Sequence, residues 1–397
     1  MAEIALAWEM GGESGHLARL AALGSAFRAR GHETTYILQD LTRAEALLRS
    51  GERWFQAPVW SRRITGLPPA VTAAETLIRF GYLEADGLTG ICRAWRNLFD
   101  LLGPDLLVGD CAPTALLAAR GMGLDAAVCD NGYGVPPDGS PLPPYRWWQR
   151  PQPTPLPGAE QEVLQTVNAV ATRLGAPVFG TLSELFRGEA TFLCTLAELD
   201  HYPDRGPADY FGPVTQLSAG EPPLWPEGAG PRVFVYAQPD YPGLASICDA
   251  LKAARARTIA YLPGVEQALR KRLKSNRFRV SEHPLNLALV RSQCDAVVCH
   301  GGLGTTSTAL LAGKPALLLP RHTEQAMVSM RVRALGAGIA AEPAQVEAES
   351  AALVRRLLTD PGLAAAARRF AESHSDVSAE VAADRIAASC ESRFGLR

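Results

Sequence analysis

The chain has 397 residues, of which 47% are hydrophobic and 20% charged, and its formal net charge is −2. This length exceeds the size at which a single hydrophobic core usually stops growing, so we expect two domains. The near-neutral charge excludes nucleic acid or an anionic membrane as the main partner, and the hydrophobic content excludes disorder.

Eight cysteines are scattered along the chain, and several lie inside apolar runs. This usage is typical of buried free thiols in a reducing compartment rather than of a disulfide framework. At the start of the chain, the apolar run between Glu3 and Glu9 is too short for the core of a signal peptide. No stretch approaches the ~18 apolar residues of a membrane span. We therefore expect a cytoplasmic protein with no integral membrane segment.

The first half of the chain alternates short apolar runs with helical patterns, which favours a parallel sheet covered by helices on both faces. We expect its strands at residues 4–8, 34–38, 105–110 and 125–130. Between the first two strands, Leu20, Leu23 and Phe27 share one helical face, and this helix ends at Gly31.

A glycine-rich turn separates the first expected strand from that helix. It contains Gly11, Gly12 and Gly15 and ends at His16. The dipole at a helix N-terminus disfavours protonation of a histidine, so the neutral ring of His16 is able to accept a proton. Asp110 ends another expected strand and would orient this ring and stabilise its imidazolium. For an isolated histidine, a capping residue satisfied by the backbone is the alternative.

Two aromatic segments of the first half are candidates for binding an apolar acceptor. Phe80 and Tyr82 lie in residues 77–95, although aromatic residues at helical spacing more often belong to a core. Trp147 and Trp148 lie in a proline-rich stretch, 135–158, whose length is typical of a functional or mobile loop. These two tryptophans either receive an apolar substrate or pin the loop to the domain.

The second half repeats the alternation after a linker at about residues 212–231, which is rich in proline and glycine. We expect strands at residues 232–237, 257–262, 277–281, 295–300 and 315–320. The basic run 269–279 is either a patch for anionic lipid or phosphate or, as is more common, a solvated helix face.

The stretch HGGLGTTSTALLAGKPALLLPRHTEQ, residues 300–325, predicts a strand end, a glycine turn and a helix. In an open α/β sheet, ligands bind at this edge, and the N–H groups of the first helical turn attract a diphosphate. His300 would donate from its ring to a phosphate oxygen, and the hydroxyls of Thr305 and Thr306 add donors. A tight turn without a ligand is the alternative.

Several other chemistries lack their motifs. The chain has no Asp-x-Asp pair and no metal-ligand spacing, so we expect no metal. It also lacks the glycine patterns of dinucleotide-binding and P-loop proteins and the nucleophile elbow of α/β-hydrolases.

The two glycine-rich segments, GGESGHLARLAALGSAFRARGHE and residues 300–325, resemble those of nucleotide-sugar-dependent glycosyltransferases of the GT-B fold. This α/β family modifies natural products, lipids and other small acceptors. The resemblance implies two Rossmann-like domains facing a cleft, residues 1–215 for the acceptor and 232–375 for the nucleotide sugar. It also implies that residues 376–397 form a helix that crosses back to pack on the first domain.

The resemblance also assigns roles. His16 would be the general base of an inverting, metal-independent transfer, with Asp110 as its partner. The donor would be a UDP-sugar or, less favoured, a dTDP-sugar, with no other cofactor. The expected contacts of the donor are His300, Gly302, Gly304 and Thr305 at the diphosphate, Glu324 and Gln325 at the sugar, and more weakly Gln238, His283 and Pro284. The expected contacts of the acceptor are Gly12, Phe80, Tyr82 and Trp147.

This chain departs from the family pattern at Thr308, where some relatives carry an acidic residue for the ribose, and in the base-binding segment 279–290, which lacks the usual Trp/Pro/Gln pattern. A nucleotide-sugar hydrolase or epimerase on the same fold and an inactive binding protein are the competing interpretations. The sequence does not identify the acceptor, the sugar, the nucleotide or the oligomeric state.

Overall fold

The computed structural model describes residues 1–12, 15–62, 64–214 and 220–397. Contacts divide these residues into two compact units. The first unit holds the described residues up to 214 together with Ser378–Arg397, and the second holds those from 220 to Val377. The expected glycine-rich turn and the expected linker each include residues outside the described part of the chain, 13–14 and 215–219.

The first unit contains a parallel sheet with the strand order β3-β2-β1-β4-β5-β6. The strands are β1 (Glu3–Trp8), β2 (Glu33–Leu38), β3 (Arg53–Gln56), β4 (Leu106–Asp110), β5 (Asp125–Asp130) and β6 (Ala190–Leu193). The helices are α1 (Gly15–Ala29), α2 (Ala44–Leu47), α3 (Ala73–Ile78), α4 (Ala85–Leu102), α5 (Pro113–Ala119), α6 (Ala159–Arg173), the 3-10 turns η1 (Leu182–Phe186) and η2 (Ala197–Leu199), and the last helix of the chain, α14 (Ala379–Phe394). In the register, Trp8 pairs with Leu38 on one side and with Asp110 on the other, so three strands end together.

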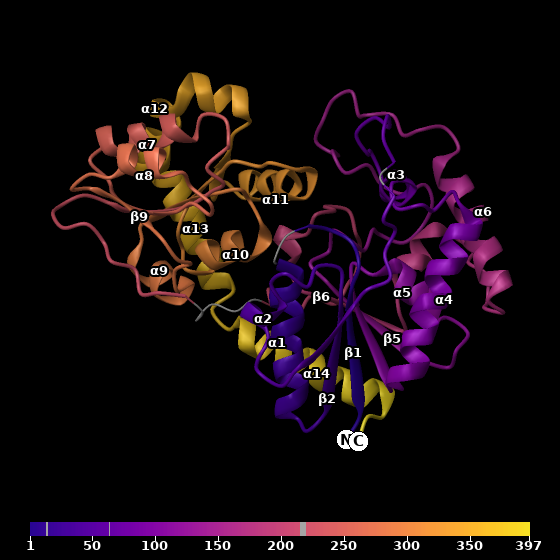
Figure 1. Ribbon diagram of the computed structural model, residues 1–397. Coiled ribbons are helices and arrows are strands. Elements are labelled where there is room, and N and C mark those ends of the chain that lie inside the picture. Colours follow the sequence, from indigo (N-terminus) through magenta and orange to yellow (C-terminus); the bar gives the residue numbers. More distant parts are fainter. Residues whose placement is uncertain (13–14, 63, 215–219) are drawn as a thin grey trace. The chain divides into compact units, whose positions relative to one another are not determined.

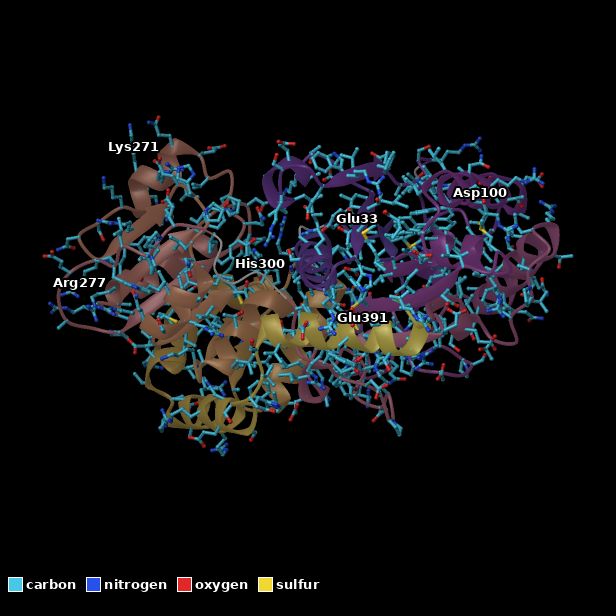
Figure 2. All side chains as sticks on the ribbon, turned by 90° about the horizontal axis from the view of Figure 1, so that it is seen from below. Glu33, Asp100, Lys271, Arg277, His300 and Glu391 are labelled. Atoms are coloured by element: carbon cyan, nitrogen blue, oxygen red, sulfur yellow. The ribbon has the colours of Figure 1, made fainter. Side chains whose placement is uncertain are left out.

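Helices cover both faces of this sheet, with α1 and α14 on one side and α4 and α5 on the other (Figure 1). The apolar face of α14 is buried in the same core as α1, and Ile386 and Cys390 have no exposed surface. At its outer edge, Glu391, which is labelled on the yellow helix in Figure 2, accepts from Arg30 at 2.7 Å and pairs with His32 at 2.9 Å. The last helix of the chain is therefore part of the first unit.

The second unit contains another parallel sheet, with the strand order β12-β11-β10-β7-β8-β9. The strands are β7 (Arg232–Tyr236), β8 (Arg257–Tyr261), β9 (Phe278–Ser281), β10 (Ala296–Cys299), β11 (Ala316–Leu318) and β12 (Gly338–Ala340). The helices are α7 (Leu244–Ala253), α8 (Gln267–Leu273), α9 (Leu287–Gln293), α10 (Leu303–Leu311), α11 (Thr323–Ala334), α12 (Pro343–Thr359) and α13 (Pro361–Ser373). Cys299 pairs with Tyr236 and with Leu318, so β7, β10 and β11 end together.

The two sheets share one strand order when each is counted from its own first strand. In both, the order reverses beside the first strand, between β1 and β4 and between β7 and β10. The crevice at the carboxyl ends of the strands at such a switch point is where doubly wound sheets bind ligands. The fold therefore offers one candidate site in each unit.

The expected α/β class is confirmed, and each expected strand is present with ends that shift by at most two residues. Three short edge strands, β3, β6 and β12, were not predicted. Among the described residues, no helix is long and apolar enough to cross a membrane.

The basic run of the second unit falls on α8 and β9. Arg270 pairs with Glu282, and Arg272 pairs with Asp249 at 2.9 Å. Figure 2 shows Lys271 and Arg277 at the margin of the second unit. These pairs and this placement agree with a solvated helix face.

Candidate active site

The first candidate site lies at the switch point of the first sheet. His16 is the second residue of α1, and Asp110 is the last residue of β4. The structure places His16 Nδ1 3.0 Å from Asp110 Oδ1, with the histidine side chain 14% exposed and the aspartate fully buried. A carboxylate only accepts, so Nδ1 carries the proton of the neutral ring and Nε2 is the basic nitrogen. The expected pair is therefore brought together with the tautomer that a general base needs.

Gly11 keeps the region around the basic nitrogen open. Its φ of +93° favours glycine, and a Cβ built on Gly11 would lie 2.6 Å from His16 Nε2. Any side chain here would displace the ring of His16, so the turn needs glycine for space as well as for conformation. Gly12, an expected acceptor contact, is exposed, and a Cβ there would meet no atom within 4 Å.

Arg19 is a third member of this site that the sequence analysis did not identify. Its Nε donates to Asp110 Oδ2 at 2.8 Å and its Nη2 donates to Oδ1 at 3.1 Å. Burial alone would raise the pKa of Asp110, but the positive charge of Arg19 and the hydrogen bond with His16 outweigh it and lower the pKa. Asp110 is therefore held as a carboxylate.

Trp8, the last residue of β1, also contacts His16. The two rings are stacked with centroids 5.2 Å apart and planes 14° apart. The indole Nε1 donates to the backbone oxygen of Met10 at 2.6 Å, which fixes the indole in place. The imidazole is thus positioned by a ring on one face and a carboxylate at one edge.

Glu9, the next residue along the chain, is a buried carboxyl beside this site. It accepts from the backbone N–H groups of Thr114 and Ala115, both at 3.0 Å, and from the Thr114 hydroxyl. Burial raises the pKa of Glu9 to about 7, although these three hydrogen bonds oppose the rise. The group is ionised only in part at neutral pH.

The expected acceptor aromatics lie in different environments. Tyr82 has no exposed surface, and its hydroxyl is 2.7 Å from Thr114 Oγ1, so it is a core residue that an acceptor cannot touch. Phe80, after α3, is half-buried. Trp147 is half-buried, and its Nε1 donates to the backbone oxygen of His201 at 3.0 Å, which agrees with the alternative of a loop anchor.

The second candidate site lies at the switch point of the second sheet and contains His300, directly after β10. Its Nδ1 donates to the backbone oxygen of Leu319 at 2.7 Å, and its Nε2 accepts from the backbone N–H of Gln238 at 2.7 Å. The buried ring thus links the chain after β7 to the chain after β11. In this arrangement its N–H is used within the protein, and the expected donation from the ring to a phosphate stays a prediction.

The glycine turn after His300 leads into α10. Gly301 has a φ of +84°, and a Cβ there would lie 2.3 Å from Ser329 Oγ, so the turn requires glycine. Gly302 is the N-cap, and the first intrahelical bond runs from Thr306 N–H to Gly302 oxygen at 3.1 Å. The earlier N–H groups, those of Gly304 and Thr305 included, have no acceptor within the helix and make the N-terminus an anion-binding surface.

Two of the hydroxyls near this turn point inward. Thr306 is fully buried, with its Oγ1 3.8 Å from Cys299 Sγ, and Thr308 donates to the backbone oxygen of Gly304 at 2.7 Å. The expected extra donation from Thr306 is therefore corrected. Thr305 is half-buried in the first turn of the helix.

The expected sugar contacts lie in the first turn of α11. Glu324 is half-buried there. Gln325 is only 2% exposed, and its Oε1 accepts from the backbone N–H of Arg321 at 2.9 Å. The amide of Gln325 therefore holds the loop between β11 and α11, and Glu324 is the more accessible of the two.

His283 and Pro284 are exposed residues after β9, and His283 lies among the residues around a cavity of 360 Å³. The segment that begins at residue 220 forms the other side, where Glu221 N–H donates to the Pro284 oxygen at 2.8 Å. Among the described residues of the whole chain, no group of three His, Cys, Asp or Glu side chains is arranged to hold a metal ion.

Comparison with known proteins finds relatives in sequence and in fold. A family model, the C-terminal domain of erythromycin biosynthesis protein CIII-like proteins, matches residues 246–391. The PGL/p-HBAD biosynthesis rhamnosyltransferase of Mycobacterium bovis is 28% identical over 317 residues, which cover 74% of this chain and 66% of the relative. The chain thus spans slightly less than two thirds of that relative's length.

The fold is also found in solved glycosyltransferase structures. The calicheamicin glycosyltransferase CalG4 aligns with a TM-score of 0.74 at 21% identity, covering 100% of this chain and 98% of CalG4. The spinosyn rhamnosyltransferase SpnG complexed with thymidine diphosphate aligns with a TM-score of 0.69 at 19% identity, covering 97% and 99%. The chain therefore has the GT-B fold of these glycosyltransferases, and its sequence is similar to that of glycosyltransferase relatives and, in residues 246–391, to the EryCIII-like C-terminal domain.

Proposed function

We propose that this chain transfers a sugar from a pyrimidine nucleoside diphosphate sugar to a hydroxyl or amine of a small-molecule or lipid acceptor, with inversion and without a metal ion. The observation that carries the proposal is the buried His16–Asp110 pair at a switch point, with Nδ1 and Oδ1 3.0 Å apart. A module that only binds its ligand has no need of a histidine held as a base.

The reaction is a single displacement. His16 Nε2 removes the proton of the acceptor, and the acceptor atom forms its bond to the anomeric carbon as the bond from that carbon to the diphosphate oxygen breaks. The configuration inverts because attack and departure occur on opposite sides of one carbon. Asp110 stabilises the imidazolium, and no covalent intermediate with the protein forms.

The leaving diphosphate carries the charge that develops in the transition state. We assign its binding to the backbone N–H groups of Gly302, Gly304 and Thr305 at the start of α10, aided by the helix dipole. His300 and Gln238 support this site by holding the neighbouring strand ends together. These fixed donors take the role that a metal ion fills in other transferases, and the proposal of metal independence rests on them.

For the donor nucleotide, the relative with bound thymidine diphosphate supports a dTDP-sugar, while the sequence favours a UDP-sugar. The shared chemistry is a pyrimidine nucleoside diphosphate. We propose Glu324 as a contact of the sugar hydroxyls, since it is the accessible acid in the first turn of α11. The cavity beside His283 is the proposed region for the base.

We also propose a reducing compartment such as the cytoplasm. None of the eight cysteines forms a disulfide. Cys129 on β5 and Cys194 directly after β6 have their sulfur atoms 3.4 Å apart and are not linked. An oxidising compartment would favour a bond between thiols this close.

Thermal unfolding with dTDP, UDP and purine nucleotides tests the donor site, because a ligand that binds only the folded state raises the midpoint. We expect a rise with dTDP or UDP that EDTA does not alter. Gly302→Ala should abolish the rise without unfolding the protein, since a Cβ at Gly302 meets no atom within 4 Å but occupies space above the helix N-terminus. Gly362→Ala, at the start of α13, is the matched control and should keep the rise.

Transfer itself is tested by nucleotide release from dTDP- and UDP-sugars with a panel of acceptors, comparing the wild type with His16→Asn. Release that depends on an acceptor and is lost in the variant supports the transferase. Equal release of free sugar without any acceptor would show a hydrolase instead, and the absence of binding by any nucleotide would refute the proposal.

A further inference from the structure

Arg19 holds Asp110 in a way that the proposed chemistry does not yet explain. The guanidinium spans the whole carboxylate, with Nε at 2.8 Å from Oδ2 and Nη2 at 3.1 Å from Oδ1. The same Nη2 lies 3.5 Å from His16 Nδ1. His16 and Arg19 are three residues apart on α1, so both side chains lie on one face of the helix and reach the same carboxylate.

This cluster is largely buried. The side chains of Arg19 and Asp110 are 7% and 0% exposed, and that of His16 is 14% exposed. Two further titratable groups face the cluster, Asp130 at the end of β5 and Cys194 after β6. Burial and the charge of Asp110 raise the pKa of Asp130, while the charge of Arg19 opposes this rise.

We propose that Arg19 is a positioning residue for the general base. Its bidentate hydrogen bonds to Asp110 orient Oδ1 toward His16 Nδ1. Its positive charge also offsets the charge of Asp110, so that the His16–Asp110 pair stays unprotonated at neutral pH. The proposal rests on the proposed function of His16 as the base. It goes beyond that function because it assigns the tuning of the base to a residue that is not expected to touch either substrate.

The physical reason is the balance of charges around one imidazole. A carboxylate beside a histidine favours the imidazolium, so the ring would already be protonated when the acceptor binds and could not act as a base. With the guanidinium on the far side of the carboxylate, Arg19 and Asp110 form an ion pair with no net charge. This pair favours the protonated form of the His16 ring less than a lone carboxylate would. Asp110 still orients the ring, but the ring remains a base.

The test compares Arg19→Met, Arg19→Lys and the wild type. Met keeps the apolar stem and removes the charge, while Lys keeps the charge but not the fork. In Arg19→Met, we expect the acid limb of the pH profile of kcat/KM to move upward by about one to two pH units, because the pair retains a proton to higher pH whichever partner holds it. In Arg19→Lys, the acid limb should stay within about half a pH unit of that of the wild type. The maximum kcat/KM should be lower, because Lys cannot make the bidentate hydrogen bonds that the guanidinium makes.

Arg28→Met is the matched control, because Arg28 is also on α1 and pairs with a carboxylate, that of Glu52. Its loss removes one cation and one ion pair from the same helix, distant from Asp110. This variant should keep the wild-type limb even if it unfolds at a lower temperature. Circular dichroism and the thermal midpoint verify that each variant is folded.

A second readout does not depend on turnover. The imidazole carbon signal of His16, identified by its loss in His16→Gln, is titrated by NMR in the wild type and in Arg19→Met. An upward shift of its midpoint in the variant supports the inference even if no donor is ever turned over, in which case only the proposed function fails. An unchanged midpoint and an unchanged acid limb in folded Arg19→Met would overturn it and leave Arg19 as a structural ion pair.

Discussion

The pH dependence of stability should reveal the buried carboxyl of Glu9. Its pKa is raised from the ordinary 4.5 to about 7 by burial at the end of β1. Replacing Glu9 by Gln removes the titration but keeps the size of the side chain. The oxygen of the new amide still accepts from the N–H groups of Thr114 and Ala115. The expected effect is therefore on the slope of stability with pH.

The sign follows from linkage. Between pH 4.5 and about 7, the folded state keeps the Glu9 proton while the unfolded state has released it, so raising the pH favours unfolding. The difference of about 2.5 between the two pKa values corresponds to about 3 kcal/mol, lost progressively from pH 4.5 to 7 and fully absent above it. Below pH 4.5, both states are protonated and Glu9 contributes no slope.

The assay is urea unfolding followed by tryptophan fluorescence from pH 5 to 8.5. Six of the seven tryptophans lie in the first unit, so the signal reports the unit that contains Glu9. Relative to the wild type, Glu9→Gln should gain stability steadily as the pH rises. Thr114→Val, which removes a hydrogen bond that lowers the pKa of Glu9, should extend the wild-type slope to higher pH. Parallel curves for the wild type and Glu9→Gln would refute the reasoning.

Three further substitutions probe other parts of the molecule. Gly301→Ala should lower the thermal midpoint of the second unit and abolish nucleotide binding, because the positive φ costs roughly 1–2 kcal/mol and the Cβ overlaps Ser329; a variant as stable as Gly302→Ala would contradict this. Ile386→Ala should destabilise the first unit by about 2–5 kcal/mol in urea unfolding, since this fully buried side chain joins α14 to the core; an unchanged fluorescence transition would show that α14 is dispensable. Asp110→Asn should lower kcat/KM about 10²–10⁴-fold while nucleotide binding persists, and full activity would remove Asp110 from the mechanism.

The central strands of both sheets were predictable because they are buried on both faces and appear as uninterrupted apolar runs. The missed edge strands carry weaker signals. β3 reads Arg-Trp-Phe-Gln, and β12 has only three residues, Gly338–Ala340. Such segments become strands because a neighbour already in the sheet offers its hydrogen-bonding edge, which is a tertiary effect that the local pattern does not contain.

The candidate site was predictable where it depends on position along the chain. His16 and Asp110 each follow from the rule that functional groups lie at carboxyl ends of parallel strands. Arg19 was not identified because its role depends on a contact with a residue 91 positions away, although its spacing of three from His16 was a usable signal. Tyr82 was placed among the acceptor contacts for its residue type, whereas it is fully buried and its hydroxyl bonds with Thr114, 32 residues later, which the local pattern does not contain.

The two histidines show why equivalent positions do not imply equivalent chemistry. Each lies beside a switch point, and each ring donates from Nδ1, but the partner of His16 is a carboxylate and that of His300 is a backbone carbonyl. A carboxylate stabilises an imidazolium through its charge, whereas a carbonyl only fixes the ring, and Nε2 of His300 accepts from Gln238 N–H. Protonation therefore suits the ring of His16 and would break the link that His300 makes. In the proposed function, proton transfer is therefore assigned to the first unit, and His300 in the second unit holds the strand ends beside α10 in place.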